Sequence, residues 1–389
     1  MVAFGGTFAD GRPAVSKNLR ILVVTRSYPA AGDLYQYPFV HRRVLAYREA
    51  GHDLAVFRPG PGGVHEYEGI ACTSGDGAEL AALARDFHPD VVAAHGVSEG
   101  MWPTLLALNE LSLCAWLHGS EIPAFFLQKA EAIADSGQRA ATLEQVAVRR
   151  RFWRDTLDRA RSDLRLVFPS HSAAAMMCED LEGLRNFAVI PNPIDTDLFT
   201  YQPKDADQRF AILSIRPFDS TTYANDLSIA AILNLADRPG FERLHFTIIG
   251  DGPLFDETLE PIRGFANVTI RRQFLTQSQI ADEHSRHGIF LVPTRLDTQG
   301  VSRDEAMSSG LVPVTNAIAP VLEFADETCA ALAPPDDGAG LADALSEMVE
   351  SPTLFCQRSA AAARRVRNQS SNELIIPAEL ALLAEAASG

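Results

Sequence analysis

The stretch LDTQGVSRDEAMSSGLVPV, residues 296–314, lies where an apolar strand is expected to give way to a helix. It contains a carboxylate at Asp297, a glycine at Gly300 and a second carboxylate at Glu305. Ser302 and Glu305 fit the S-x-x-E capping box, in which two side chains bind the free amides at the start of a helix. Helix capping therefore explains Glu305, but it explains neither Asp297 nor Gly300.

Around this stretch, short apolar runs alternate with helix-like segments along the whole chain. The first run is ILVVTRSYP at 21–29, and the helix-like FVHRRVLAYREAGHD follows it and closes at Gly51. Similar runs continue to Pro193 and restart at 210 with FAILSIRPF. Strands that alternate with helices build a parallel sheet covered by helices. The sequence therefore predicts an α/β fold of two Rossmann-like, doubly wound domains.

A polar, proline-bearing stretch, NPIDTDLFTYQPKDADQR at 192–209, is typical of a linker between two compact units. Ligands of open α/β sheets bind at the carboxyl ends of the strands, so two facing domains imply a central cleft. The final segment, IIPAELALLAEAA, indicates an amphipathic helix, and its docking on the first domain is one arrangement left open. The predicted units are a flexible leader at 1–18, a first domain at 19–196, a second domain at 197–370 and a C-terminal helix at 371–389.

Composition narrows the class of function. The formal charge of -16 argues against nucleic acid as the main partner, because phosphate binding needs clustered basic residues. The five cysteines are widely spaced and form no CxxC, so neither a disulfide framework nor a zinc site is indicated. The start of the chain lacks the features of a signal peptide, and no long apolar run is present. We therefore expect a cytoplasmic protein, with peripheral contact at the inner face of the membrane as an open option.

Three motifs occur in a specific order: VIPNPIDTDLF at 189–199, IIGDGP at 248–253, and an acid-x7-acid pair followed by EAMSSGLVPV. In this order they resemble the retaining glycosyltransferases of the GT-B fold, in particular family 4 (glycosyl transferases group 1), over nearly the whole chain from about Ile21. The family's first acid is a glutamate, and Asp297 is a conservative departure. The resemblance implies an acceptor-binding first domain, a donor-binding second domain, and transfer of a sugar from a nucleotide diphosphate donor to a saccharide or lipid-linked acceptor.

The opening stretch fits a binding site for such a donor. Gly300 allows the backbone amides of Gly300, Val301 and Ser302 to approach a ligand at a helix N-terminus, where a diphosphate would be stabilised. Glu305 is placed to accept hydrogen bonds from a ribose diol, and Asp297 is placed to hold hydroxyls of the transferred sugar. The resemblance implies these same roles, while pure capping stays open for Ser302 and Glu305.

Arg216 closes the strand AILSIR and is similar to the family's arginine that neutralises the leaving diphosphate. The alternative is a surface arginine after a strand. The family usually has a lysine five residues further on, and here that residue is Thr221. A second positive charge is then either missing or supplied by another residue, and the candidates are Arg272, Arg295 and Arg303.

The first domain contributes further candidates. His118, in LHGSE, is similar to the family's histidine near the donor sugar, although a structural histidine is the alternative. Gly32, in AAGDLYQYP, matches a glycine-bearing loop that faces donor and acceptor. His95 and Glu99 are weaker candidates for the acceptor side.

Gly250 and Gly252, in GDGP, allow close approach of the backbone to a ligand, although the third glycine of a dinucleotide fingerprint is absent. Asp195 and Asp197 form a D-x-D of the kind that holds a metal in the other major glycosyltransferase fold. They lie in the linker, so we expect no metal and no cofactor other than the nucleotide diphosphate sugar as donor substrate.

The run RRRFWR at 149–154 interleaves basic and aromatic residues. It indicates a solvated helix face or, alternatively, a contact with anionic lipid headgroups, where each basic residue contributes roughly 1 kcal/mol. Two rival functions stay open at this point. One is a catalytically degenerate, sugar-nucleotide-binding partner of another glycosyltransferase, and the other is a GT-B-fold epimerase or phosphorylase.

Overall fold

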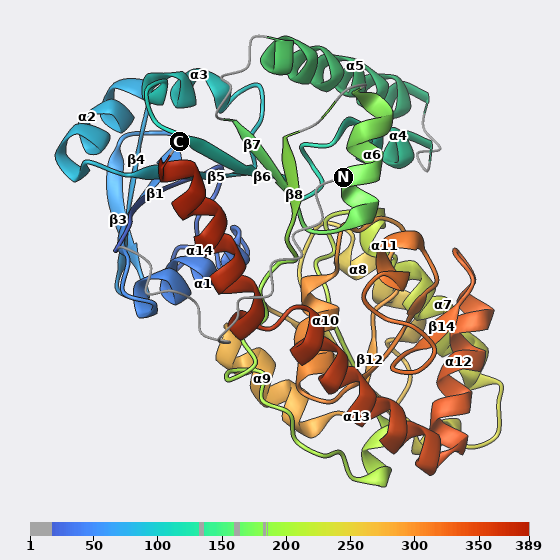
Figure 1. Ribbon diagram of the computed structural model, residues 1–389. Coiled ribbons are helices and arrows are strands. Elements are labelled where there is room, and N and C mark those ends of the chain that lie inside the picture. The colour runs from blue at the N-terminus through green and yellow to red at the C-terminus, as the bar shows by residue number, and fades with distance from the viewer. Residues whose placement is uncertain (1–17, 132–135, 159–163, 182–183, 185, 389) are drawn as a thin grey trace.

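The computed structural model describes residues 18–131, 136–158, 164–181, 184 and 186–388. The predicted leader therefore lies outside the described residues, except for Asn18. Two sheets, each flanked by helices, form the two halves of the molecule (Figure 1). This is the predicted architecture of two doubly wound α/β domains.

The first sheet has eight strands in the order β3-β4-β2-β1-β5-β6-β7-β8, and all neighbours are parallel except β3 and β4. Its central strands are buried on both faces, which explains why their sequences are continuously apolar. The strands are β1 (Arg20–Thr25), β2 (Asp53–Pro59), β3 (Gly63–Tyr67), β4 (Ile70–Gly75), β5 (Val91–His95), β6 (Leu113–Trp116), β7 (Arg165–Phe168) and β8 (Phe187–Val189).

The second sheet has six parallel strands in the order β11-β10-β9-β12-β13-β14. Its strand order reverses between β9 and β12, and loops at the carboxyl ends of those two strands form a crevice in such folds. The strands are β9 (Ala211–Ile215), β10 (His245–Gly250), β11 (Val268–Arg272), β12 (Ile289–Leu291), β13 (Val312–Asn316) and β14 (Ala331–Ala333). The predicted boundary at 196/197 falls between the last strand of the first sheet and the first strand of the second.

Helices cover both sheets (Figure 1). None of the helices in the described ranges combines the length and the apolar composition that crossing a bilayer requires. Their bounds are α1 (Pro38–Glu49), α2 (Gly77–Phe87), α3 (Trp102–Leu105), α4 (Pro123–Glu131), α5 (Ser136–Asp158), α6 (His171–Asp180), α7 (Asn225–Ala236), α8 (Phe255–Leu259), α9 (Gln277–Arg286), α10 (Val301–Ser308), α11 (Ala319–Leu322), α12 (Gly338–Glu350), α13 (Pro352–Gln369) and α14 (Asn372–Ser388). Short 3₁₀ turns are η1 (Leu106–Leu108), η2 (Ala206–Phe210), η3 (Thr221–Tyr223), η4 (Phe241–Arg243) and η5 (Glu260–Ile262).

The last helix, α14, packs on the first domain although it follows the second in sequence (Figure 1, red against blue). Leu380 and Leu383 belong to the same buried cluster as Ile21 and Val23 of β1, and burial of such a side chain contributes about 1.5–3 kcal/mol. The carboxylate of Glu379 accepts hydrogen bonds from Nε of Arg43 at 2.9 Å and from the hydroxyl of Tyr47 at 2.6 Å. These contacts tie the chain end to α1.

Candidate active site

A cleft of about 600 Å³ lies between the two domains, where loops at the carboxyl ends of both sheets face each other. Most of the site residues expected from the sequence line it. They are His118, Arg216, Asp297, Gly300, Val301, Ser302 and Glu305. The residues of the second domain lie together because its strand order reverses between β9 and β12, which places the loops after these two strands side by side at one edge of the sheet.

The N-terminus of α10 is open to this cleft. Gly300 occupies the N-cap with φ 94°, a conformation that glycine adopts without strain, and the helix has no side-chain cap. The capping box expected from Ser302 and Glu305 is therefore wrong, because the helix begins at Val301 and places both residues inside it. The uncapped first-turn amides and the helix dipole make this end of α10 suited to an anion.

Arg216 extends toward the same position from the end of β9. Its Nη1 donates a hydrogen bond to Oγ of Ser302 at 3.3 Å, and its Nη2 donates to the carbonyl of Pro293 at 3.4 Å. Its Nε has no partner among the described residues, and no carboxylate in that part of the chain lies within ion-pair distance. With only 6% of its surface exposed, Arg216 is not the surface arginine of the alternative interpretation.

Burial lowers the pKa of Arg216, and the negative charge of Asp297 acts in the opposite direction. A buried cation without an ion pair carries an uncompensated desolvation cost. An anion bound between Arg216 and the amides of α10 would remove much of that cost.

Glu305 is the second unpaired group. Its carboxylate accepts no hydrogen bond from the described residues, and burial raises its pKa to about 8. Arg42, which lines the cleft from α1, lowers this pKa, and the charges of Asp304 and Asp195 raise it. The acid is therefore available to a ligand and is not held by a structural partner.

Asp297 is oriented by its own loop. Its Oδ1 accepts hydrogen bonds from the amides of Thr298 at 2.8 Å and Gln299 at 3.1 Å. Its Oδ2 accepts none within the described ranges, so one oxygen is fixed and the other is free for a ligand.

His118 brings the first domain into contact with this loop. Its carbonyl accepts a hydrogen bond from the hydroxyl of Thr298 at 3.1 Å, and Gly119 leaves space for the Thr298 methyl group. Its Nε2 lies 3.1 Å from Nδ1 of His95, and the two rings stack. Burial lowers the pKa of both histidines well below the usual value, so both are neutral near pH 7. His95 thus lies behind His118 and does not itself line the cleft.

The three arginines considered as replacements for the lysine all have carboxylate partners. Arg272 pairs with Asp251 and Asp256, Arg295 with Asp226 and Asp336, and Arg303 with Asp304. None of the three lines the cleft, and neither does Thr221. Arg42 is a cationic lining residue that the sequence motifs did not reveal, and its position in the middle of α1 carries no local signal.

The remaining predicted glycines do not line the cleft. A Cβ at Gly250 would lie 2.0 Å from the carbonyl oxygen of Arg216, and one at Gly252 would lie 2.4 Å from the backbone of Phe218. Both glycines therefore let the loop after β10 pack closely against the loop that carries Arg216. Gly32 is exposed, and its neighbours Leu34 and Tyr35 line the cleft in its place.

Glu99 likewise lies outside the cleft lining, whereas Asp195 borders the cleft. Oδ1 of Asp195 accepts a hydrogen bond from the amide of Leu198 at 2.9 Å, while Asp197 is exposed. In the described part of the chain, no group of three or more histidine, cysteine, aspartate or glutamate residues is arranged to hold a metal.

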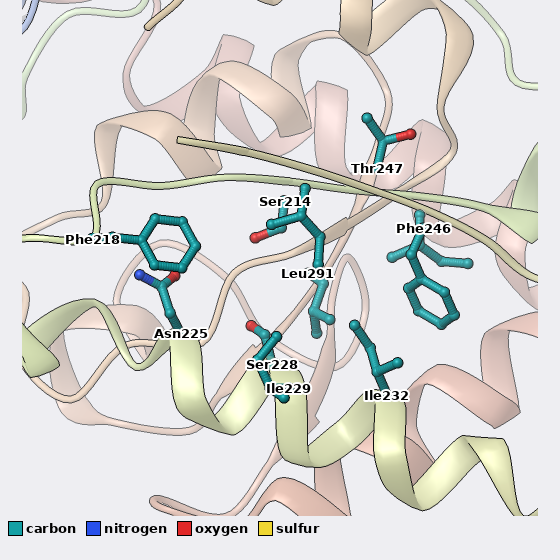
Figure 2. A pocket seen from close by; sticks show the side chains of 11 residues that line it. Ser214, Phe218, Asn225, Ser228, Ile229, Ile232, Phe246, Thr247 and Leu291 are labelled. Carbon is teal, nitrogen blue, oxygen red and sulfur yellow. The ribbon is translucent and has the colours of Figure 1, made fainter. Parts of the chain in front are cut away.

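A second cavity lies inside the core of the second domain (Figure 2). It measures about 10 Å³ and lies between α7 and the sheet, next to Ser214, Ser228 and Phe246. This volume is at the lower limit for a single water molecule. The cavity is a packing gap and not a substrate site.

Comparison with known protein families gives a match within the second domain. Residues 211–351 match the family model described as glycosyl transferases group 1. This range contains Arg216, Asp297 and Glu305. No curated protein sequence matches the chain.

Solved structures resemble nearly the whole chain. Sucrose-phosphate synthase from Thermosynechococcus elongatus has a TM-score of 0.71 at 15% identity, over 94% of this chain and 98% of that one. The Anabaena protein HepE, solved in complex with UDP and glucose, has a TM-score of 0.70 at 14% identity, over 94% and 98%. A glycosyltransferase from Rickettsia africae has a TM-score of 0.67 at 14% identity, over 95% and 99%. The chain has the GT-B fold.

Proposed function

We propose that this protein is a retaining glycosyltransferase that transfers a sugar from a nucleotide diphosphate donor to a saccharide or lipid-linked acceptor, in polysaccharide or glycolipid assembly. The observation that carries the proposal is the position of Arg216, a buried guanidinium without an ion pair beside the uncapped N-terminus of α10. The match of residues 211–351 to glycosyl transferases group 1 and the binding of UDP by HepE, a protein of the same fold, support it.

In this proposal the diphosphate lies between the Arg216 guanidinium and the amides near Gly300, which stabilise the negative charge that develops as it leaves. The ribose diol donates hydrogen bonds to Glu305. Asp297, through its free Oδ2, holds a hydroxyl of the transferred sugar, and His118 contacts that sugar from the first domain. The second domain thus binds the donor and the first domain binds the acceptor.

The bond between the anomeric carbon and the diphosphate oxygen breaks, and the acceptor hydroxyl attacks the same face of the sugar. The proton of that hydroxyl passes to the departing phosphate. No protein nucleophile and no metal are required in this scheme, so the enzyme acts by positioning and by charge stabilisation.

The test is proton NMR of the purified protein with a panel of nucleotide diphosphate sugars. We expect donor turnover with at least one of them, and a new glycosidic bond that keeps the anomeric configuration of the donor. Inversion would contradict the retaining assignment. Isomerisation of the donor sugar would instead indicate an epimerase, and phosphate-dependent release of a sugar phosphate from a glucan would indicate a phosphorylase.

One observation favours a second candidate, a non-catalytic partner that only binds sugar nucleotides. Thr221 replaces the expected lysine, and the three arginines that were candidates to compensate are held in ion pairs. Tight binding of a nucleotide diphosphate sugar, without hydrolysis or transfer in the same NMR experiment, would support this candidate.

A further inference from the structure

Two tyrosines line the cleft close to Arg216. Tyr35 lies in the loop between β1 and α1 of the first domain, and Tyr223 is the last residue of η3, in the loop that follows β9. Tyr223 comes two residues after Thr221, the position where the family usually has a lysine. Unlike Thr221, it lines the cleft, so this loop still presents a polar side chain to a ligand.

Tyr223 packs against the Arg216 guanidinium. The centre of its ring lies 4.9 Å from Cζ of Arg216, which is a cation–π contact. Its hydroxyl makes no hydrogen bond with another described residue. Burial is the main cause of its raised pKa, the charges of Asp219 and Asp297 raise the pKa further, and that of Arg216 lowers it. The hydroxyl is therefore protonated at neutral pH and has a free O–H donor near Arg216.

Tyr35 is held in the cleft by a contact between the two domains. Its ring centre lies 4.3 Å from that of Phe274, an exposed residue that follows β11. Its hydroxyl also makes no hydrogen bond within the described ranges. Burial raises the pKa of Tyr35 to about 12, with smaller increases from Glu305 and Tyr223 and a decrease from Arg216. A second protonated donor therefore lies within electrostatic reach of Arg216 and Glu305.

We propose that Tyr35 and Tyr223 donate hydrogen bonds to the diphosphate of the sugar donor and so take the place of the lysine that Thr221 replaces. This inference rests on the proposed function and assigns two further residues to donor binding. Tyrosine hydroxyls are neutral, so they supply directed hydrogen bonds to the phosphate oxygens, while the positive charge comes from Arg216 and the amides of α10. Because Tyr35 belongs to the first domain, the diphosphate site is made by both domains and not by the second alone.

Phenylalanine substitutions test this proposal, because they remove only the hydroxyl groups. Tyr35→Phe keeps the ring that contacts Phe274, and Tyr223→Phe keeps the ring that contacts Arg216. Calorimetric titration of UDP, GDP, ADP and dTDP into the wild-type protein first identifies the nucleotide diphosphate that binds most tightly. This nucleotide and its nucleoside, which lacks the phosphates, are then titrated into each variant.

We expect each substitution to raise the dissociation constant of the nucleotide diphosphate by about 10-fold, because a hydrogen bond to a charged group is lost. The double variant should bind it more weakly than either single variant, and the nucleoside should bind all of them alike. The matched control is Tyr201→Phe. Tyr201 is also half-buried beside an arginine, with its ring centre 5.6 Å from Cζ of Arg367, but it does not line the cleft. Its substitution should leave the dissociation constant unchanged.

Unchanged affinity for the nucleotide diphosphate in both phenylalanine variants would overturn the proposal. An equal loss of affinity for nucleotide and nucleoside would also overturn it, because the tyrosines would then maintain the shape of the cleft without contacting the phosphates. The titration of the wild-type protein tests the proposed function separately. If no nucleotide diphosphate binds, the proposed function fails and this inference fails with it; if one binds and the variants bind it as the wild type does, only this inference fails.

Discussion

Nη1 of Arg216 lies 3.3 Å from Oγ of Ser302, and this contact joins the end of β9 to the first turn of α10. The two residues stand on either side of the strand-order reversal between β9 and β12. A guanidinium and a set of free helix amides therefore face one ligand position. Such a pair suits a group with two adjacent negative charges, as a diphosphate has.

The first prediction concerns Arg216→Gln. Loss of a charge-assisted contact with the diphosphate should raise its dissociation constant by about 10- to 100-fold, as expected for hydrogen bonds of about 1.5–3 kcal/mol. The dissociation constant of a nucleoside monophosphate should rise by a smaller factor. Calorimetric titration measures both, and Arg243→Gln, an exposed arginine of the same domain, serves as control. Equal losses for mono- and diphosphate would argue that Arg216 does not contact the diphosphate.

The second prediction concerns the stability of Glu305→Gln. Burial raises the pKa of Glu305 in the folded protein to about 8, from an ordinary value of 4.5. The carboxyl group of Glu305 therefore binds its proton more tightly in the folded state than in the unfolded state. The protonated group contributes stability that is fully present below pH 4.5 and is lost as the pH rises through 8. The glutamine variant lacks this pH dependence of folding stability, because its side chain does not titrate. In urea unfolding at about pH 9, the variant should be more stable than wild type by about 1–3 kcal/mol, a range discounted for partial exposure.

At about pH 4 the same variant and wild type should unfold almost alike, because the carboxyl group is then mostly neutral in both the folded and the unfolded state. Glu350→Gln, at an exposed site, should show no difference at either pH. At about pH 9, where Glu305 is ionised, the variant that gains stability should nevertheless bind nucleotide diphosphate about 10- to 100-fold more weakly, since an ionised acceptor for the ribose diol is lost. Unchanged affinity would show that the carboxylate does not contact the ribose.

The third prediction is that donor turnover survives chelation of divalent ions. The proposed charge stabilisation uses Arg216 and backbone amides, and the described residues contain no arrangement of three potential metal ligands. Turnover of the nucleotide diphosphate sugar should be the same with and without EDTA. Its loss in EDTA and recovery with manganese or magnesium would show that a metal carries part of the charge.

Much of the fold was predictable because its signals are local. Buried parallel strands are continuously apolar, and the breaks between them carry glycine or proline, so both doubly wound sheets could be inferred. The loop from Asp297 to Glu305 was also recognisable, because strand, glycine and helix follow one another in sequence. The β3–β4 hairpin at the sheet edge was not predicted, since its alternating, half-exposed pattern is weak.

Side-chain pairing could not be inferred from the sequence, because the partners are distant in the chain. Arg295 and Arg303 were candidates for the second positive charge, but Arg295 is held by Asp226 and Asp336 and Arg303 by Asp304. The docking of α14 depends on Glu379 and Arg43, which are 336 residues apart. The predicted capping box was wrong for a different reason. Gly300, with its positive φ, is the N-cap, so Ser302 lies one residue past the first helical position and cannot cap the helix.

The central claim is that the cleft binds a nucleotide diphosphate between Arg216 and α10, and a crystal structure of the complex tests it most directly. We predict diphosphate oxygens within hydrogen-bond distance of the Arg216 guanidinium and of the amides of Val301 and Ser302, with the ribose hydroxyls at Glu305. A nucleotide bound outside the cleft, or one whose diphosphate contacts neither Arg216 nor these amides, would contradict the account.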